Sequence, residues 1–156
     1  MEQSRESLPS AILVVRRLRG LLLFLLAAEI IGVTAELLLI AHWEGVWQWT
    51  PLIVLSVGLI FVLAHGIFRN RASRRAFQLV MVVFVLSGAL GTWLHYDGRV
   101  EFRQELDPSL TGWSLFRSAM TGSSTPPVLA PGVMIQMGFL GLICAYRSAA
   151  DEERGA

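Results

Sequence analysis

Four apolar runs, each about as long as a helix that crosses a membrane, limit what this chain can fold into. The runs cover residues 20–41, 50–68, 76–95 and 128–146. A transmembrane helix needs roughly 20 consecutive apolar residues, and Trp43, Trp47 and Trp49 lie between the first two runs, as in an interfacial aromatic belt. The sequence therefore predicts an all-α integral membrane protein, a four-transmembrane-helix bundle formed by a single domain over residues 1–156, with an outer loop at 96–127.

Composition supports a membrane protein and excludes several kinds of function. Apolar residues make up 54% of the chain and charged residues 16%, whereas an average soluble domain carries about 25% charge. The net charge of +1 leaves no bulk electrostatic basis for binding nucleic acid. All 13 basic residues are arginine, which excludes lysine Schiff-base chemistry. The single cysteine, Cys144, cannot form a disulfide within the chain.

The positions of the arginines predict the orientation. Ten of the 13 lie in the N-terminal segment, between the second and third runs, or in the C-terminal tail. The other three, Arg99, Arg103 and Arg117, lie between the third and fourth runs. Short loops rich in arginine stay in the cytoplasm. The predicted location is the plasma (inner) membrane, multi-pass, with both termini cytoplasmic.

The first run has a second interpretation. Arginines followed by an apolar stretch and by Val33, Thr34 and Ala35 resemble a secretory signal with a small-residue cleavage site before Glu36. The apolar pattern, however, continues to Trp43, as it does in an uncleaved helix. We therefore expect the first run to be retained as a span.

The outer loop is predicted to have two parts. Residues 97–105 are charged and are expected to form a loop in water. Asp107 and Pro108 then match the start of a short amphipathic helix, with a capping residue followed by proline. The apolar stripe of this helix consists of Leu110, Trp113, Phe116 and Met120. Ser114 and Ser118 are expected to face water, so the helix suits the membrane interface or a partner protein.

Two acids inside the first span define a possible polar line. At 1.5 Å per residue, Glu29 lies about 13 Å into the membrane, near the depth of Ser87 and Gln136, and Glu36 lies near the depth of His95. Ionisable groups at such depths usually face protein or trapped water. The line could be neutral acids that fix helix packing, or it could be a proton or cation relay.

Histidines suggest two further hypotheses. A metal ion could be bound at the outer mouth by Glu36, His95, Asp97 and Glu101. Alternatively, a b-type haem could be held by His42 and His95, although a regular helix would project His42 roughly 140° from the Glu29 and Glu36 stripe. His65 lies at another depth and is predicted to be a hydrogen-bonded packing residue.

Small residues predict close contacts between helices. Gly88 with Gly91, and Gly138 with Gly141, form small stripes on the third and fourth spans, where another helix can approach closely.

The sequence lacks the common enzyme motifs, which leaves a binding role as the leading hypothesis. It has no phosphate-binding loop, zinc-protease motif or nucleophile elbow. The leading hypothesis is a non-enzymatic accessory or assembly subunit that lies in the lipid bilayer and binds another membrane-protein subunit, or a second copy, through Trp113, Phe116 and Met120. The alternatives are ion transport along the polar line and a haem redox subunit.

Overall fold

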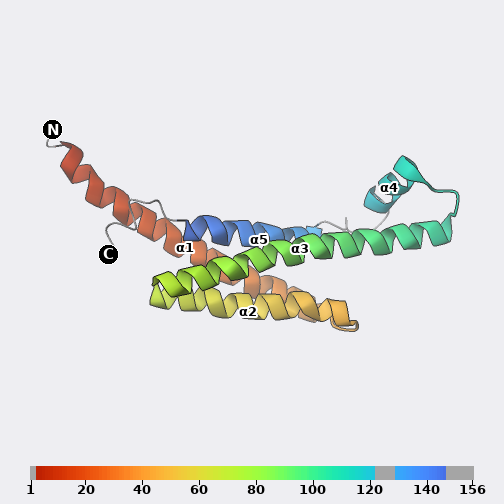
Figure 1. The fold of residues 1–156 in the computed structure, drawn as a ribbon, viewed down its shortest axis with the longest axis horizontal. Helices are drawn as coiled ribbons and strands as arrows, with labels where there is room; N and C mark the ends of the chain where they lie inside the picture. The colour runs from red at the N-terminus through yellow and green to blue at the C-terminus, as the bar shows by residue number, and fades with distance from the viewer. Residues whose placement is uncertain (1–2, 122–128, 147–156) are drawn as a thin grey trace.

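Helices joined by short turns make up residues 3–121 and 129–146, which are the residues that the computed structural model of the protein describes (Figure 1). The helices are α1 (Gln3–Leu39), α2 (Val46–Phe68), α3 (Arg71–Leu106), α4 (Gly112–Thr121) and α5 (Leu129–Ala145). Three of them are long and apolar enough to cross a membrane: α1 over Leu13–Leu39, α2 and α3. With 17 residues, α5 lies at the short end of the range of about 17–25 residues. The prediction of four spans is therefore supported for three helices.

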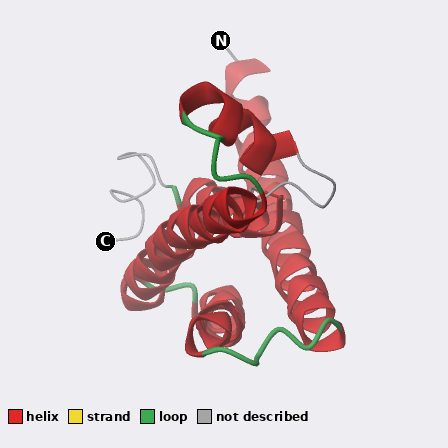
Figure 2. Ribbon diagram, turned by 90° about the vertical axis from the view of Figure 1, so that its right-hand side faces the viewer, coloured by secondary structure: helices red, strands yellow, loops and turns green. Residues whose placement is uncertain are grey.

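The four apolar helices contact one another in a ring. α1 packs against α2 and α5, and α3 packs against the same two helices on the other side. Within the described residues no Cα atom of α1 lies within 8 Å of one in α3, so these two helices are not direct neighbours. Seen end-on, the long helices run side by side and are joined by loops at their ends (Figure 2). This arrangement places α1 and α3 across the ring from each other.

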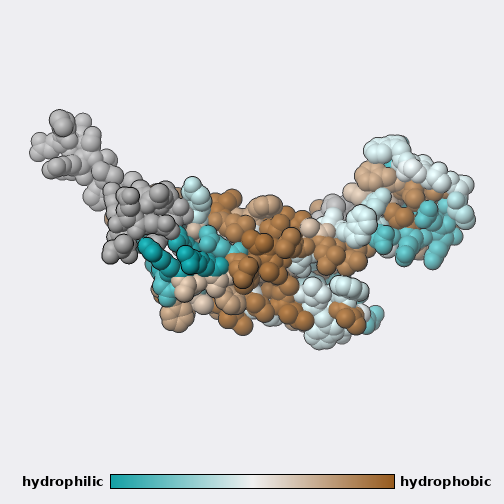
Figure 3. Space-filling view, in the orientation of Figure 1, coloured by the Kyte–Doolittle hydropathy of each residue, from teal (hydrophilic) through white to brown (hydrophobic). Residues whose placement is uncertain are grey.

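Apolar side chains fill the interior and also cover the outside. The fully buried residues include Leu26, Ile30, Leu55, Phe77 and Phe84. Large apolar side chains point outward from every long helix. Examples are Phe24, Ile60 and Leu79, with 69%, 63% and 67% of their surface exposed. Figure 3 shows the result as a hydrophobic band across the middle of the molecule with hydrophilic residues at both ends, which is the surface that a bilayer would cover.

Glycines let α3 and α5 approach closely, as the sequence predicts. A Cβ atom on Gly88 would lie 2.7 Å from the carbonyl oxygen of Pro131, and one on Gly138 would lie 2.7 Å from the carbonyl oxygen of Met81. Both distances are too short for a real side chain. The helices therefore approach through these two glycines, from opposite sides of the interface.

The third helix is longer than the sequence analysis predicts. α3 continues without a break to Leu106, so residues 97–105 are helical and the expectation of a loop there is wrong. Charge indicates contact with water but does not prevent a helix, because Glu, Arg and Gln are good helix formers. The chain leaves the helix at Asp107, since the following Pro108 disfavours helical geometry in the residue before it.

Asp107 ends α3 and does not begin α4. Its Oδ1 atom accepts hydrogen bonds from the Ser109 hydroxyl at 2.6 Å and the Ser109 amide at 3.0 Å, which forms a turn typical of aspartate. These two hydrogen bonds, the side-chain one first, lower the pKa of Asp107. The short helix then begins at Gly112, where φ is +53°, four residues after Pro108, where it was predicted to begin.

Residues 96–121, here named the projecting unit, extend beyond the ends of α2 and α5 (Figure 1). Within this unit α4 packs back on α3. The Arg99 guanidinium donates a hydrogen bond of 3.1 Å to the carbonyl oxygen of Ala119, and the rings of Tyr96 and Phe116 lie 6.0 Å apart. Ala119 is fully buried in this contact.

Replacing Arg99 with methionine should loosen α4. The substitution keeps much of the aliphatic stem but removes a charged donor, so we expect the amide protection of residues 112–121 to fall by about tenfold in hydrogen–deuterium exchange. Arg117→Met, at an exposed position of α4, is the control and should change protection little. Unchanged protection in Arg99→Met would show that the aromatic contacts alone hold α4.

Candidate functional site

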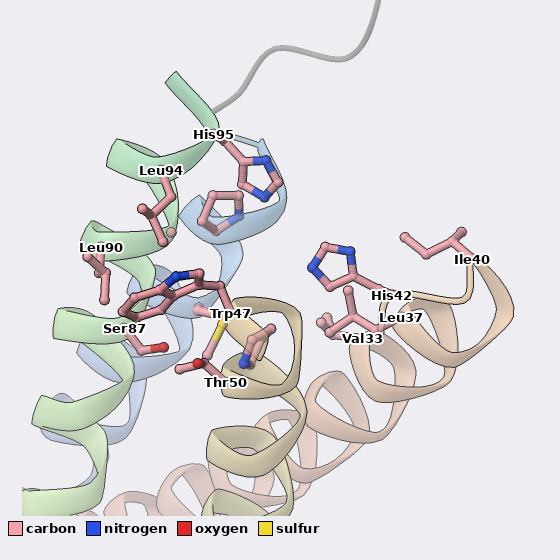
Figure 4. Close-up of a pocket in the computed structure, with 14 residues that line it drawn as sticks. Val33, Leu37, Ile40, His42, Trp47, Thr50, Ser87, Leu90, Leu94 and His95 are labelled. Carbon is pink, nitrogen blue, oxygen red and sulfur yellow. The ribbon is translucent and has the colours of Figure 1, made fainter. Parts of the chain in front are cut away.

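A pocket of about 190 Å³ lies at one end of the helical ring, between α1, α2, α3 and α5. Its walls are mostly apolar and include Val33, Leu37, Leu90 and Leu94. The polar side chains that line it are His42, Trp47, Thr50, Ser87 and His95 (Figure 4). Concave, mostly apolar pockets with a few converging polar groups are the usual form of a ligand site.

The turn after α1 places His42 at this pocket. Ala41 adopts a left-handed conformation with φ of +53°. The amide of His42 donates to the carbonyl oxygen of Leu37 at 2.9 Å, and the amide of Ala41 donates to that of Leu38 at 3.2 Å. This pair of bonds is a Schellman motif, here with alanine where glycine is usual. The sequence analysis extended α1 to residue 41 as a regular helix and so assigned His42 the wrong direction.

His42 and His95 face each other across the mouth of the pocket. Their ring centres are 6.3 Å apart and the ring planes differ by 28°. Figure 4 shows both rings turned toward the space between α1 and α3. Burial lowers the pKa of His42, and the neighbouring His95 lowers it further. The sequence analysis placed Glu36 at the depth of His95 and paired His42 with His95 only in the haem hypothesis. The structure places His42, and not Glu36, beside His95.

Two hydroxyl groups in the pocket are available to a ligand. Elsewhere Thr34, Ser56 and Thr92 donate to the carbonyl oxygen four residues earlier, at 2.7–2.9 Å. Thr50 and Ser87 make no hydrogen bond of this kind within the described residues, and both line the pocket. Their hydroxyls can therefore bind water or a polar group that enters it.

The residues of the predicted polar line lie at several different places. His95 and Ser87 line the pocket. Glu29 is partly buried on α1, and Glu36 and Gln136 are exposed. Neither glutamate makes an ion pair or hydrogen bond with a described residue. The glutamates on α1 and the residues on α3 lie on helices that are not direct neighbours, although α5, which carries Gln136, packs against both. A relay along this line stays a prediction.

The predicted cofactors remain hypotheses. Residues 3–121 and 129–146 contain no group of three or more His, Cys, Asp or Glu side chains that could hold a metal ion. Glu36, Asp97 and Glu101 are exposed and do not line the pocket with His95. The volume of about 190 Å³ is below the range of about 300–1,000 Å³ that is usual for ligand pockets, which disfavours a haem macrocycle inside it.

The third histidine has a structural role, as predicted. His65 stacks on Phe77, with ring centres 5.0 Å apart and planes 7° apart. Its Nδ1 atom lies 3.4 Å from the Ser73 hydroxyl. His65 is far from the pocket, at the opposite end of α2, and serves as an internal control for it.

The predicted interface residues lie on α4 with different exposures. Trp113 has 75% of its surface exposed and Phe116 has 39%, while Met120 is partly buried. The Trp113 and Phe116 rings stack with centres 5.1 Å apart. Ser114 is exposed as expected, but Ser118 is partly buried.

Trp47 and Thr50 were not predicted to belong to a site, because only the turn at Ala41 brings their helix end beside His42.

Comparisons with protein-family models, curated proteins and solved structures find no match for this chain. What the fold defines is a helical protein with three helices suited to span a membrane. Function must therefore be argued from the pocket and from the projecting unit.

Proposed function

We propose that this chain is a non-enzymatic subunit of a membrane-protein assembly, which binds a partner protein through the projecting unit. The observation that carries the proposal is the exposed aromatic pair on α4, in which Trp113 stacks on Phe116 and keeps 75% of its surface exposed. Exposed tryptophan supported by a second aromatic ring is typical of the residues that dominate binding energy at protein interfaces.

The surroundings of this pair favour a protein partner. Phe102 and Leu106 on the end of α3 are also exposed, at 55% and 64%, and they lie among the charged residues Glu101, Arg103 and Glu105. A patch with apolar anchors and a charged rim is typical of a protein interface. α3 carries this patch beyond the hydrophobic band, where Figure 3 shows hydrophilic surface.

Photo-crosslinking in native membranes tests the proposal. A photoreactive phenylalanine analogue at position 113 should form a discrete protein adduct. Adding Trp113→Asp to a chain that carries the analogue at position 116 should reduce the adduct at least about tenfold, since interface tryptophans contribute 2 kcal/mol or more.

Ser114→Asp is the matched control, because Ser114 is exposed, adjacent to Trp113, and the same charge is introduced in the first turn of α4, where the helix dipole tolerates it. It should preserve the adduct. Adducts with lipid alone would assign α4 to the membrane interface instead, and equal loss in both variants would show that the charge rather than the tryptophan is responsible.

A further inference from the structure

The paired histidines provide a site that is independent of the projecting unit. The ring centres of His42 and His95 are 6.3 Å apart and their planes are within 28° of parallel. Both rings lie at the edge of the pocket (Figure 4). Because each metal–nitrogen bond is about 2 Å long, one ion can be bound by both residues once each ring turns a nitrogen toward it. We propose that His42 and His95 bind a single monovalent copper ion, Cu(I), between their imidazole rings.

The number of ligands favours Cu(I) over other metals. Zinc takes four ligands in structural sites and three protein ligands in catalytic ones, and Ca²⁺ and Mg²⁺ require six or more oxygen atoms. The described residues offer no third His, Cys, Asp or Glu to this pair. Cu(I) accepts two opposed nitrogen donors, because a closed-shell monovalent ion is stable in a linear site.

The charge and softness of the pocket agree with the same ion. Two neutral imidazoles leave the charge of a bound ion uncompensated, and none of the described residues lining the pocket carries a carboxylate. A single positive charge costs much less to desolvate than a double one. Met134 adds a polarisable thioether to the mostly apolar lining of the pocket, while the two imidazole nitrogens are the ligands.

The backbone supports a preformed site. The Schellman turn at Ala41 fixes the position of His42, and His95 belongs to the continuous helix α3. Little reordering of the backbone is then required when the ion binds, because only the two side chains have to turn.

Titration of the purified, detergent-solubilised full chain with Cu(I) under anaerobic conditions tests the proposal, with bicinchoninate as the competing chromogenic chelator. We expect one Cu(I) per chain. His42→Gln and His95→Gln should each weaken binding by about 100-fold or more, since even ligands of the outer shell contribute 10–100-fold. His65→Gln and Glu36→Gln are matched controls and should bind as the parent chain does.

Three readouts keep the proposal falsifiable. Copper X-ray absorption should show two nitrogen ligands at about 2 Å. Circular dichroism and size-exclusion profiles identify any variant that fails to fold. If a histidine variant does not fold, the X-ray absorption spectrum of the parent chain decides whether two histidines bind the copper. The proposal is wrong if both folded histidine variants bind Cu(I) as tightly as the parent chain does. It is also wrong if the same two residues bind Zn²⁺ more tightly than Cu(I). A Soret absorption band that requires both histidines would show that they bind haem instead. Trp113→Asp should leave copper binding unchanged, so failure of this proposal is distinct from failure of the partner interface.

Discussion

Replacing Gly138 with leucine is expected to separate α5 from α3 and to produce the largest loss of stability of any single substitution considered for this chain. A Cβ atom at position 138 would lie 2.7 Å from the carbonyl oxygen of Met81 and 3.0 Å from the amide nitrogen of Val85. Both are backbone atoms of α3 and cannot rotate away. Overpacking of a core costs about 1–3 kcal/mol when side chains can adjust, so a clash with backbone should cost more than about 3 kcal/mol.

Gly132→Leu is the matched control for this prediction. Gly132 is on the same helix, and a Cβ atom there has nothing within 4 Å. In thermal unfolding followed by tryptophan fluorescence in mild detergent, Gly138→Leu should unfold many degrees below the parent and Gly132→Leu close to it. If the two variants unfold at the same temperature, the contact between α3 and α5 does not limit stability.

The sequence was sufficient to predict the apolar helices and the glycines at which helices approach closely, because both depend on local patterns. Runs of apolar residues imply helices in a membrane, where every backbone polar group must be bonded within the segment. Small residues such as Gly88 and Gly138 mark where two such helices approach. The prediction of His65 as a packing residue also holds, since its ring stacks on Phe77.

The sequence analysis misjudged the end of α3 because hydropathy changes before the secondary structure does. Residues 97–105 are polar, and polarity shows only that the segment is in water. Their helical propensity was the better guide to the backbone, and Pro108 was the signal for the end of the helix. The Asp107–Pro108 pair, interpreted as a cap followed by the first helical turn, likewise placed the start of α4 at Pro108 instead of Gly112.

The site was harder to predict, because it depends on one non-helical residue. Extending α1 as a regular helix directs His42 away from the pocket, whereas the left-handed Ala41 turns it toward His95. Alanine rarely adopts this conformation, so nothing in the sequence marks position 41 as the place where the helix ends. The pairing of the two histidines is therefore a consequence of tertiary structure and of one local turn.

Cysteine labelling should give an all-or-none result for the predicted topology. In a Cys144→Ala background, Ala72→Cys is expected to react only from the cytoplasmic side and Thr111→Cys only from the outside. Both positions are exposed, they lie on either side of the apolar part of α3, and most arginines lie on the side of Ala72. Labelling after permeabilisation is the control, and both positions should then react. Reaction of both from one side of intact membranes would show that α3 does not span.

Asp151→Cys extends the same experiment to α5, whose 17 residues make it the shortest of the four apolar helices. A helix of 17 residues is about 26 Å long at 1.5 Å per residue, slightly less than the hydrocarbon thickness of about 30 Å. The bilayer can thin locally to match it at a cost of a fraction of a kcal/mol per Å. That cost is small beside the burial of the apolar α5 surface, so we expect α5 to span and Asp151→Cys to react from the same side as Ala72→Cys. Reaction from the side of Thr111→Cys would mean that α5 enters the membrane without crossing it and that the protein has three spans.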